Sequence, residues 1–159
     1  MVLTVALVLA GCGGEGAGST ISPTPTASVT SGTFALSDSG CGYEGVTQVA
    51  AGQLTAKLAN QTADRAHFDF WRLLPGHEYA EFTAYINEEG RRLRSAEPEQ
   101  GHPAFATLVT STVVNAHGTG LLTTSVEAGR YGMACIRWKL AGEGPLDMYP
   151  SETVAVGSS

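Results

Sequence analysis

Apolar residues alternate with polar residues through most of this chain, and this period of two limits the fold more than any other feature of the sequence. Leu54, Ala56 and Leu58 fall on one face of an extended segment, and Phe68 and Phe70 fall on one face of another. Successive side chains of a strand point to opposite faces of a sheet, so the alternation predicts strands with one buried face. Such segments cover residues 33–36, 54–58, 66–74, 105–114, 121–126, 131–138 and 153–156. Because turn-forming residues separate them, the expected fold is an all-β sandwich.

One segment has the period of a helix instead. Tyr79, Phe82 and Ile86 form a single apolar stripe at helical spacing. We expect a short helix over residues 77–87, or as far as residue 94 with Gly90 ending its first part. This helix is inserted between two predicted strands and leaves the all-β class unchanged.

The start of the chain is typical of a secreted bacterial lipoprotein. An apolar run, residues 2–9, is followed by the small residues Ala10 and Gly11 and then by Cys12. The run is much shorter than the roughly 20 apolar residues that span a bilayer, and it has the length of a signal-peptide core. We expect residues 1–11 to be a signal peptide and Cys12 to carry lipid. That lipid would anchor the protein to the cell membrane on its extracytoplasmic face.

The rest of the chain divides into a tether and a domain. Residues 12–32 are rich in Gly, Ser, Thr and Pro and hold few large apolar residues, so we expect a disordered tether. Residues 33–157 then form one domain. The formal net charge of −6 argues against nucleic acid as a partner, because proteins that bind nucleic acid usually present a basic face. The expected partners are the membrane, through the lipid on Cys12, and an unidentified protein or small-molecule ligand.

Of the three cysteines of the chain, one is the expected lipid site and two lie in the domain. If Cys12 carries lipid, Cys41 and Cys135 remain as an even pair outside the cytoplasm, where disulfides persist. We therefore predict a Cys41–Cys135 disulfide, with two buried thiols or a metal-binding Cys135 as the alternatives. Closing a loop of this length would stabilise the fold by roughly 4–5 kcal/mol in the loop-entropy description.

Two stretches of the sequence follow a known pattern. Residues 60–74, NQTADRAHFDFWRLL, hold an Asn-containing turn before a strand with a His near its start. Residues 127–135, EAGRYGMAC, hold a turn that leads into a strand with a Cys. In this order the stretches resemble cupredoxin-like domains of bacterial envelope proteins. The resemblance covers most of the domain, and it implies a cupredoxin-like Greek-key β-sandwich and a copper site.

The copper site that the resemblance implies is incomplete in this sequence. A blue-copper site needs two His nitrogens and a Cys thiolate, usually with a weak axial Met. His67 loosely matches the first His position and Cys135 matches the Cys, but no His occurs after His117. Met148 remains, and a thioether does not replace an imidazole. We therefore expect a cupredoxin-like scaffold without a cofactor.

Other polar and aromatic groups are weaker candidates for a site. His67 and Asp69 share a strand face and are candidates for a metal site of another geometry, with ordinary surface positions as the simpler interpretation. Trp71 is a candidate partner contact, because aromatic side chains dominate binding hot spots, but a Trp in a small sandwich usually belongs to the core. Three arginines near the helix end are candidate contacts for an acidic partner, or they only complement the helix dipole: Arg91, Arg92 and Arg94.

No sequence pattern of a catalytic site is present. The chain lacks a nucleophile elbow, a phosphate-binding loop and a dinucleotide fingerprint. We predict a non-catalytic binding or interaction module of the bacterial envelope. The alternative is a periplasmic or cell-surface metal carrier, with copper as the metal, or an electron-transfer protein that uses His67.

Overall fold

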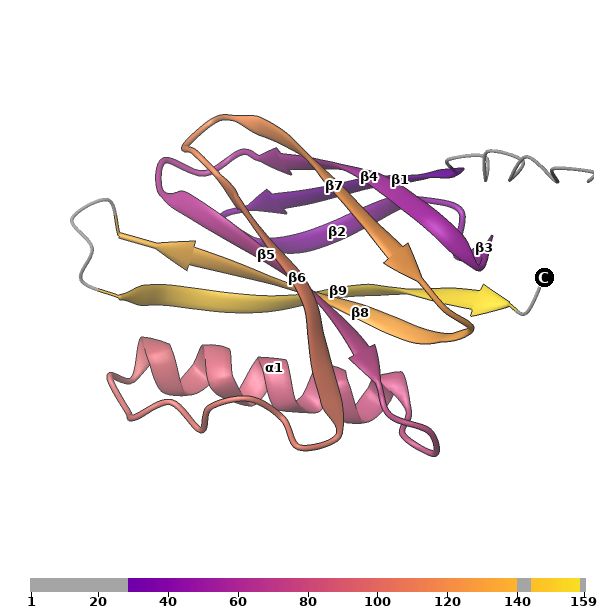
Figure 1. Ribbon diagram of the computed structural model, residues 1–159. Coiled ribbons are helices and arrows are strands. Elements are labelled where there is room, and N and C mark those ends of the chain that lie inside the picture. Colours follow the sequence, from indigo (N-terminus) through magenta and orange to yellow (C-terminus); the bar gives the residue numbers. More distant parts are fainter. Residues whose placement is uncertain (1–28, 140–143, 158–159) are drawn as a thin grey trace, which may run out of the picture.

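The computed structural model describes residues 29–139 and 144–157, and within them the chain forms two sheets and a helix (Figure 1). The elements follow one another as β1 (Val29–Ser37), β2 (Gly40–Gly45), β3 (Gln48–Ala50), β4 (Gly52–Asn60), β5 (Arg65–Leu73), α1 (Tyr79–Arg94), β6 (Ala106–Val114), β7 (Thr119–Val126), β8 (Gly129–Trp138) and β9 (Pro145–Gly157). The four-stranded sheet has the order β2-β1-β4-β7, and the five-stranded sheet has the order β3-β9-β8-β5-β6. β1 runs parallel to β4 and β3 runs parallel to β9, whereas the other strand pairs are antiparallel.

The chain changes sheet several times along its length. It crosses between the sheets from β2 to β3, from β3 to β4, from β4 to β5, from β6 to β7 and again from β7 to β8. Within the described residues, only three pairs of consecutive strands lie in the same sheet, namely β1 and β2, β5 and β6, and β8 and β9. The fold is the β-sandwich with one inserted helix that the sequence predicted.

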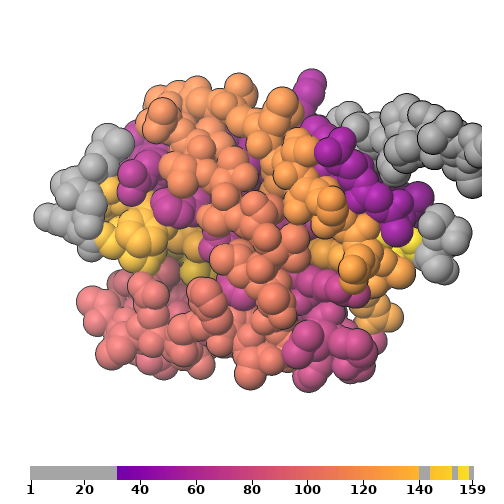
Figure 2. Space-filling model, in the orientation of Figure 1, coloured from indigo at the N-terminus to yellow at the C-terminus, as the bar shows by residue number. Residues whose placement is uncertain are grey.

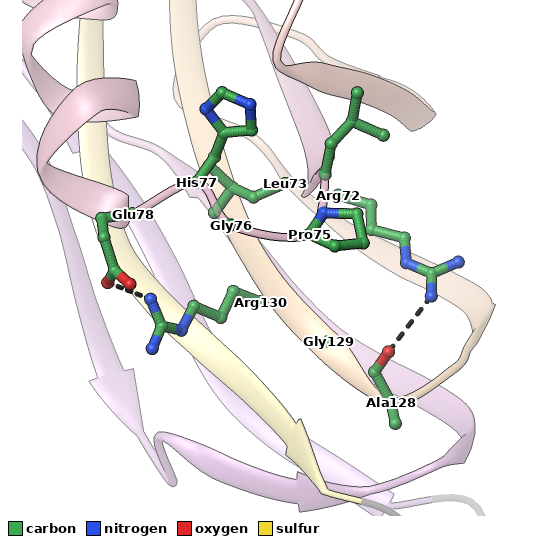
Figure 3. A pocket seen from close by; sticks show the side chains of 10 residues that line it. Arg72, Leu73, Pro75, Gly76, His77, Glu78, Ala128, Gly129 and Arg130 are labelled. Atoms are coloured by element: carbon green, nitrogen blue, oxygen red, sulfur yellow. Dashed lines mark hydrogen bonds and ion pairs between the residues drawn. The ribbon is translucent and has the colours of Figure 1, made fainter.

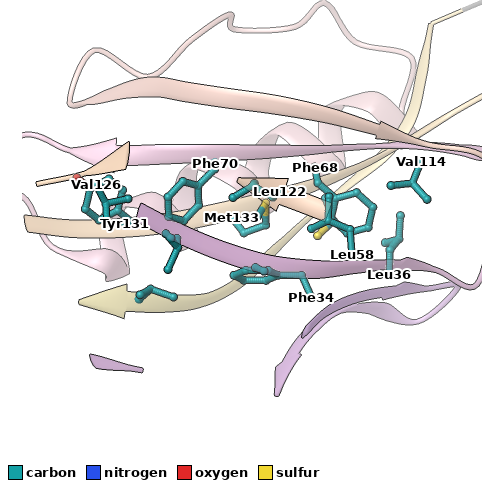
Figure 4. Close-up of a cluster of buried hydrophobic side chains, with 14 of the residues drawn as sticks. Phe34, Leu36, Leu58, Phe68, Phe70, Val114, Leu122, Val126, Tyr131 and Met133 are labelled. Carbon is teal, nitrogen blue, oxygen red and sulfur yellow. The ribbon is translucent and has the colours of Figure 1, made fainter. Parts of the chain in front are cut away.

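The main core lies between the two sheets (Figure 4). Phe68 and Phe70 of β5 and Met133 of β8 have no exposed surface, and they pack with Phe34 and Leu58 of the four-stranded sheet. Full burial of one such side chain stabilises the fold by roughly 1.5–3 kcal/mol. The faces predicted from the alternation in residues 54–58 and 66–74 are confirmed, because their inward positions are the buried ones.

The predicted disulfide joins the two sheets. Cys41 of β2 is bonded to Cys135 of β8, and their Cα atoms lie 6.1 Å apart, within the usual range for a disulfide. Cys135 is fully buried in the main core. The disulfide is confirmed, and the alternatives of two free thiols or a metal-binding Cys135 do not hold in this structure.

A second, smaller core lies between α1 and the outer face of the five-stranded sheet. Phe82 and Ile86 of α1 pack there with Trp71 and Leu73 of β5 and with Ala134 of β8. The helix comes close to the sheet because Gly132 of β8 has no side chain. A Cβ atom at that position would lie 2.6 Å from the Phe82 ring.

The helix reaches the later of its two expected ends, but it begins two residues after the expected start. It begins at Tyr79, where Glu78 and Glu81 form a capping box, and it ends at Arg94. The interpretation of Gly90 as a helix end is wrong. Gly90 is buried in mid-helix, where a Cβ atom would clash with the backbone carbonyl of Met148 in β9. This glycine permits close approach of the helix to the sheet.

Several strands lie where the sequence gave no expectation. β2 and β3 were not expected, β9 begins at Pro145 instead of Thr153, and β1 begins before Thr33. β2 reads GCGYEG, and its glycines remove the alternating pattern by which a strand is recognised. The strand expected over residues 121–126 also begins earlier: the turn before β7 covers residues 115–118, because Thr119 and Gly120 already pair with β4.

The turn before β5 is fixed by a buried asparagine. The Asn60 side chain is 2% exposed and donates to the backbone carbonyls of Asp64 and Asn115, at 2.7 and 3.0 Å. Its Oδ1 accepts from the backbone N–H and the hydroxyl of Thr62, at 3.1 and 2.8 Å. The expected turn over residues 60–64 is confirmed.

The expected signal peptide over residues 1–11, the lipid on Cys12 and most of the expected tether over residues 12–32 lie outside the described residues. Within residues 29–139 and 144–157, no helix is long and apolar enough to cross a membrane.

Candidate ligand-binding site

A small cavity lies between α1, the outer face of the five-stranded sheet and the segment that connects α1 to β6. Its volume is about 170 Å³. The lining comes from β5, α1, the connecting segment, β8 and β9: Asp69, Trp71, Tyr85, Ile86, Glu89, Glu99, Gly101, His102, Pro103, Ala134, Ile136, Trp138 and Met148. Figure 2 shows α1 and the connecting segment as a layer across the lower part of the molecule. The cavity is therefore enclosed by secondary structure on several sides.

Aromatic side chains form much of the wall of this cavity. Trp71 is 4% exposed and meets the His102 ring edge-on, with ring centroids 4.9 Å apart. Trp138 stacks on His67, also at 4.9 Å. The indole N–H groups of both tryptophans are buried and have no hydrogen-bond acceptor among the described residues. Unsatisfied buried donors are uncommon in proteins, and they often mark the place of a water molecule or a ligand.

Three carboxylates also line the cavity, whereas no Lys or Arg does. Asp69 of β5 accepts a hydrogen bond from the Ser111 hydroxyl of β6. Burial raises the pKa of the Asp69 carboxyl, although the bond from Ser111 and the nearby His67 and His102 act in the opposite direction. The charged form of Asp69 is therefore held in an environment that does not fully replace water.

Glu89 lines the cavity and also holds the segment after α1 in place. This α1 residue is 2% exposed, and its Oε1 accepts from the backbone N–H of Gln100 at 3.0 Å. The bond ties the segment after the helix to the helix itself. Glu99, on the same segment, is exposed to solvent at the rim of the cavity.

A blue-copper site does not fit the positions of the residues that the sequence offered for it. Phe68 pairs with Cys135 across β5 and β8, and both side chains face the main core. His67 pairs with Ile136, and its ring stacks on Trp138 at the outer face. His67 and Cys135 therefore lie on opposite faces of one sheet, so they cannot bind the same metal ion. The disulfide also consumes the thiolate.

Other metal geometries find limited support. His67 and Asp69 lie on the same outer face, as predicted, and His102 is near enough to act on the charge of Asp69. Burial lowers the pKa of His67, and its buried Nε2 has no hydrogen-bond partner in the described part of the chain. However, no group of three or more His, Cys, Asp or Glu side chains among the described residues is placed to hold a metal ion.

The positively charged candidates are paired within the chain. Arg91 bonds to Glu88 and Glu97, with N–O distances of 2.7 and 2.8 Å. Arg92 donates to the Pro98 carbonyl at 2.6 Å, and Arg94 pairs with Asp147. These arginines therefore fix the end of α1 to its neighbours. Trp71, the fourth candidate contact, is buried under α1 and lines the cavity.

A second hollow lies at the start of α1 (Figure 3). Its volume is about 290 Å³, and its arginines already have partners. Arg130 pairs with Glu78, and Arg72 donates to the Ala128 carbonyl and pairs with Glu127. Because the charges are already matched and exposed, this hollow offers a ligand little that water does not.

Sequence reasoning missed Glu89, Glu99, His102 and Trp138 as parts of one site. These residues lie on three separate segments, so no local spacing connects them. One signal was available in retrospect. Acidic and aromatic residues recur on the predicted helix, on the segment that follows it and on the outward faces of the strands that flank it.

Neither a protein-family model nor a curated protein matches this sequence. Among solved structures, those similar to this chain include three auracyanins. Auracyanin A, a blue copper protein from the green thermophilic photosynthetic bacterium Chloroflexus aurantiacus, has a TM-score of 0.43 and 20% identity, over 82% of this chain and 100% of that chain. Reduced auracyanin from the photosynthetic bacterium Roseiflexus castenholzii has a TM-score of 0.39 and 19% identity, over 82% of this chain and 99% of that chain. Auracyanin B has a TM-score of 0.39 and 15% identity, over 86% of this chain and 93% of that chain. Similarity at this level does not bear on metal binding by this chain.

Proposed function

We propose that this protein is a non-catalytic ligand-binding module, held at the extracytoplasmic face of the cell membrane by lipid on Cys12. One observation carries the proposal, namely the cavity under α1 with its two tryptophans and three carboxylates. An apolar hollow with a few convergent polar groups and a perturbed carboxyl is the usual form of a small-molecule site. Its 170 Å³ is below the roughly 300–1,000 Å³ typical of drug-sized ligands, so the ligand is a small molecule.

A non-catalytic role is favoured by the hydrogen bonds inside the cavity. Ser111, the hydroxyl next to the site, donates directly to Asp69. A nucleophilic serine would instead be bonded to a histidine that acts as its base. Among the described residues at the cavity, no such hydroxyl–histidine pair is found.

The chain offers a specific reporter for this proposal. Its two tryptophans, Trp71 and Trp138, both line the cavity, so intrinsic tryptophan fluorescence comes from this site alone. A library of small soluble fragments should contain members that change the fluorescence in a saturable way. The matched control is the Glu44→Gln variant, altered on the exposed β2 strand of the other sheet, which should bind the same fragments equally well. If no fragment gives a saturable change, the proposal is wrong.

The anchoring part of the proposal is tested separately in cells. The full chain should partition with membranes after expression in a bacterium that lipidates such proteins, and Cys12→Ser should release it into the soluble fraction. Release of the unaltered chain would contradict the expected lipid anchor.

A metal carrier is the second candidate function. The observation that favours it is the proximity of His67 and His102 to Asp69, because both histidines lower the pKa of that carboxyl. Equilibrium dialysis against Cu²⁺ and Zn²⁺, with His67→Gln as the comparison, separates the two functions. Stoichiometric binding that His67→Gln abolishes would favour the metal carrier over the small-molecule module.

A further inference from the structure

We infer that the cavity under α1 binds a small methylated ammonium ion, between the rings of Trp71 and Trp138 and the carboxylates of Asp69 and Glu99. This inference rests on the proposed function and narrows it to one class of ligand.

The charges at the cavity select a cation. Asp69, Glu89 and Glu99 are part of its lining, and no basic side chain of Lys or Arg is. The nearest arginines of α1 are bonded to other acids or carbonyls outside the cavity. An anionic ligand would lose its water and meet carboxylates, whereas a cation would replace water with opposite charge.

The apolar part of the wall selects a methylated cation over a bare ammonium or a metal ion. Ile86, Ala134 and Met148 contribute surface that cannot hydrogen-bond to an N–H group or bind a hard cation. Methyl groups on nitrogen spread the charge over an apolar surface, and this suits contact with ring faces and aliphatic groups. Tryptophan is the best aromatic partner for such a cation.

A metal ion is the competing cation, and its requirements are not met. Binding needs several donor atoms converging on one point. No set of three His, Cys, Asp or Glu side chains in the described part of the chain is so placed. A methylated ammonium needs no coordination geometry, because its charge acts through contact with rings and carboxylates.

The unsatisfied indole N–H groups favour a ligand that also carries a hydrogen-bond acceptor. Trp71 and Trp138 each have a buried N–H without an acceptor among the described residues. A ligand with a hydroxyl or carbonyl oxygen next to its ammonium group would offer such an acceptor. Choline has this chemistry, whereas tetramethylammonium has only the charged part.

The test measures the binding of matched probes to the purified full chain. Isothermal titration calorimetry compares choline with 3,3-dimethylbutan-1-ol, its uncharged carbon analogue of nearly the same shape. We expect choline to bind at one site per chain, the uncharged analogue to bind at least roughly tenfold more weakly, and tetramethylammonium to lie between them. Equal binding of choline and its uncharged analogue would overturn the inference.

Two variants locate the binding. Glu99→Gln, on an exposed residue that leaves the fold intact, should weaken choline binding by roughly two- to fivefold, and Asp69→Asn should weaken it by roughly tenfold or more. Neither change should alter binding of the uncharged analogue, a result that a merely structural effect would not give. Glu44→Gln should leave choline binding unchanged.

The outcomes separate this inference from the proposed function. If fragments bind the cavity saturably but none is cationic, the ligand class is wrong and the binding module stands. If neither cations nor any other fragments bind, the proposed function fails and the inference fails with it.

Discussion

The two packed regions of this molecule use opposite faces of the same five-stranded sheet, and they differ in the polarity of what they bury. On the inner face, Phe68 and Met133 are fully buried and Cys135 forms a disulfide. On the outer face, under α1, Asp69 is desolvated and the Trp71 indole has no acceptor. Desolvated or unsatisfied polar groups reduce stability. The inner face thus follows the requirements of folding, whereas the outer face departs from them where we place the ligand.

The largest effect is expected for the disulfide on the inner face. Replacing Cys41 and Cys135 by Ala should lower the free energy of unfolding by about 4–5 kcal/mol, because the bond closes a loop with a sequence separation of 94. Urea denaturation of both proteins measures the difference. Choline binding to the fraction that remains folded should be unchanged, because the cavity lies on the other face. A loss below about 1 kcal/mol would mean that the bond does not constrain the unfolded chain in solution.

A somewhat smaller effect is expected at the turn before β5. Asn60→Ala should reduce the free energy of unfolding by about 2–4 kcal/mol, because it leaves the Thr62 N–H and the Asn115 carbonyl without their buried partner. The neighbouring Gln61 is exposed, so Gln61→Ala should change the same quantity by no more than about 0.5 kcal/mol. Equal effects of the two substitutions in urea denaturation would contradict the role of Asn60.

The contact between α1 and the sheet is tested at a glycine. Gly132→Ala should lower the free energy of unfolding by about 1–3 kcal/mol, because its Cβ would meet the Phe82 ring. It should also weaken choline binding, since α1 forms one wall of the cavity. Gly42 in β2 has open space where a Cβ would be, so Gly42→Ala is the matched control. Thermal unfolding followed by circular dichroism compares the three proteins.

On the outer face, a substitution should increase the free energy of unfolding instead of lowering it. Asp69→Asn removes a desolvated charge and keeps an acceptor for Ser111, so it should raise the free energy of unfolding by at most about 1 kcal/mol at neutral pH. The same substitution should weaken choline binding. A variant that gains stability while it loses affinity distinguishes a ligand site from ordinary packing, and a loss of both would favour packing.

The smallest effect is expected in the pH dependence of that gain. The pKa of Asp69 is raised on folding, so its charge destabilises the fold above that pKa, and the penalty disappears as the pH falls through it. The difference between Asp69→Asn and the unaltered protein should therefore shrink towards acid. The pKa of His67 is lowered by burial, so His67 acts in the opposite sense and destabilises the fold as the pH falls below about 6.5. Because Asp69 also raises the pKa of His67, the two proteins are compared in a His67→Gln background, where this coupling is absent. A difference that stays constant from neutral pH to about pH 4 would contradict the raised pKa.

Local sequence patterns were enough to predict individual elements of the fold. The alternation around Leu54 and Phe68 predicted which faces are buried, and the even cysteine pair predicted the disulfide. The sequence did not predict β2 and the first part of β9, because they hold glycine, proline or polar residues in place of an alternating pattern. These strands form because neighbouring strands offer backbone hydrogen-bond partners.

The candidate site was less predictable than the fold. Asp69 and Trp71 were recognised as candidates on one strand. They form a site only together with residues of other segments, namely Glu99, His102 and Trp138. Gly90 illustrates the same limit, since its role is set by the Met148 carbonyl across the interface and not by the helix in which it lies. Contacts between distant segments leave no spacing in the sequence by which they can be recognised.

The most direct test of the ligand site follows the two indole N–H signals of Trp71 and Trp138 by ¹H–¹⁵N NMR during a titration with choline. Both residues line the cavity, and both N–H groups lack an acceptor in the described residues. We expect the two signals to shift together and to saturate with one dissociation constant, while 3,3-dimethylbutan-1-ol at the same concentrations moves them little. Indole signals that stay in place while choline is added, or that follow the uncharged analogue equally, would contradict a cation site under α1.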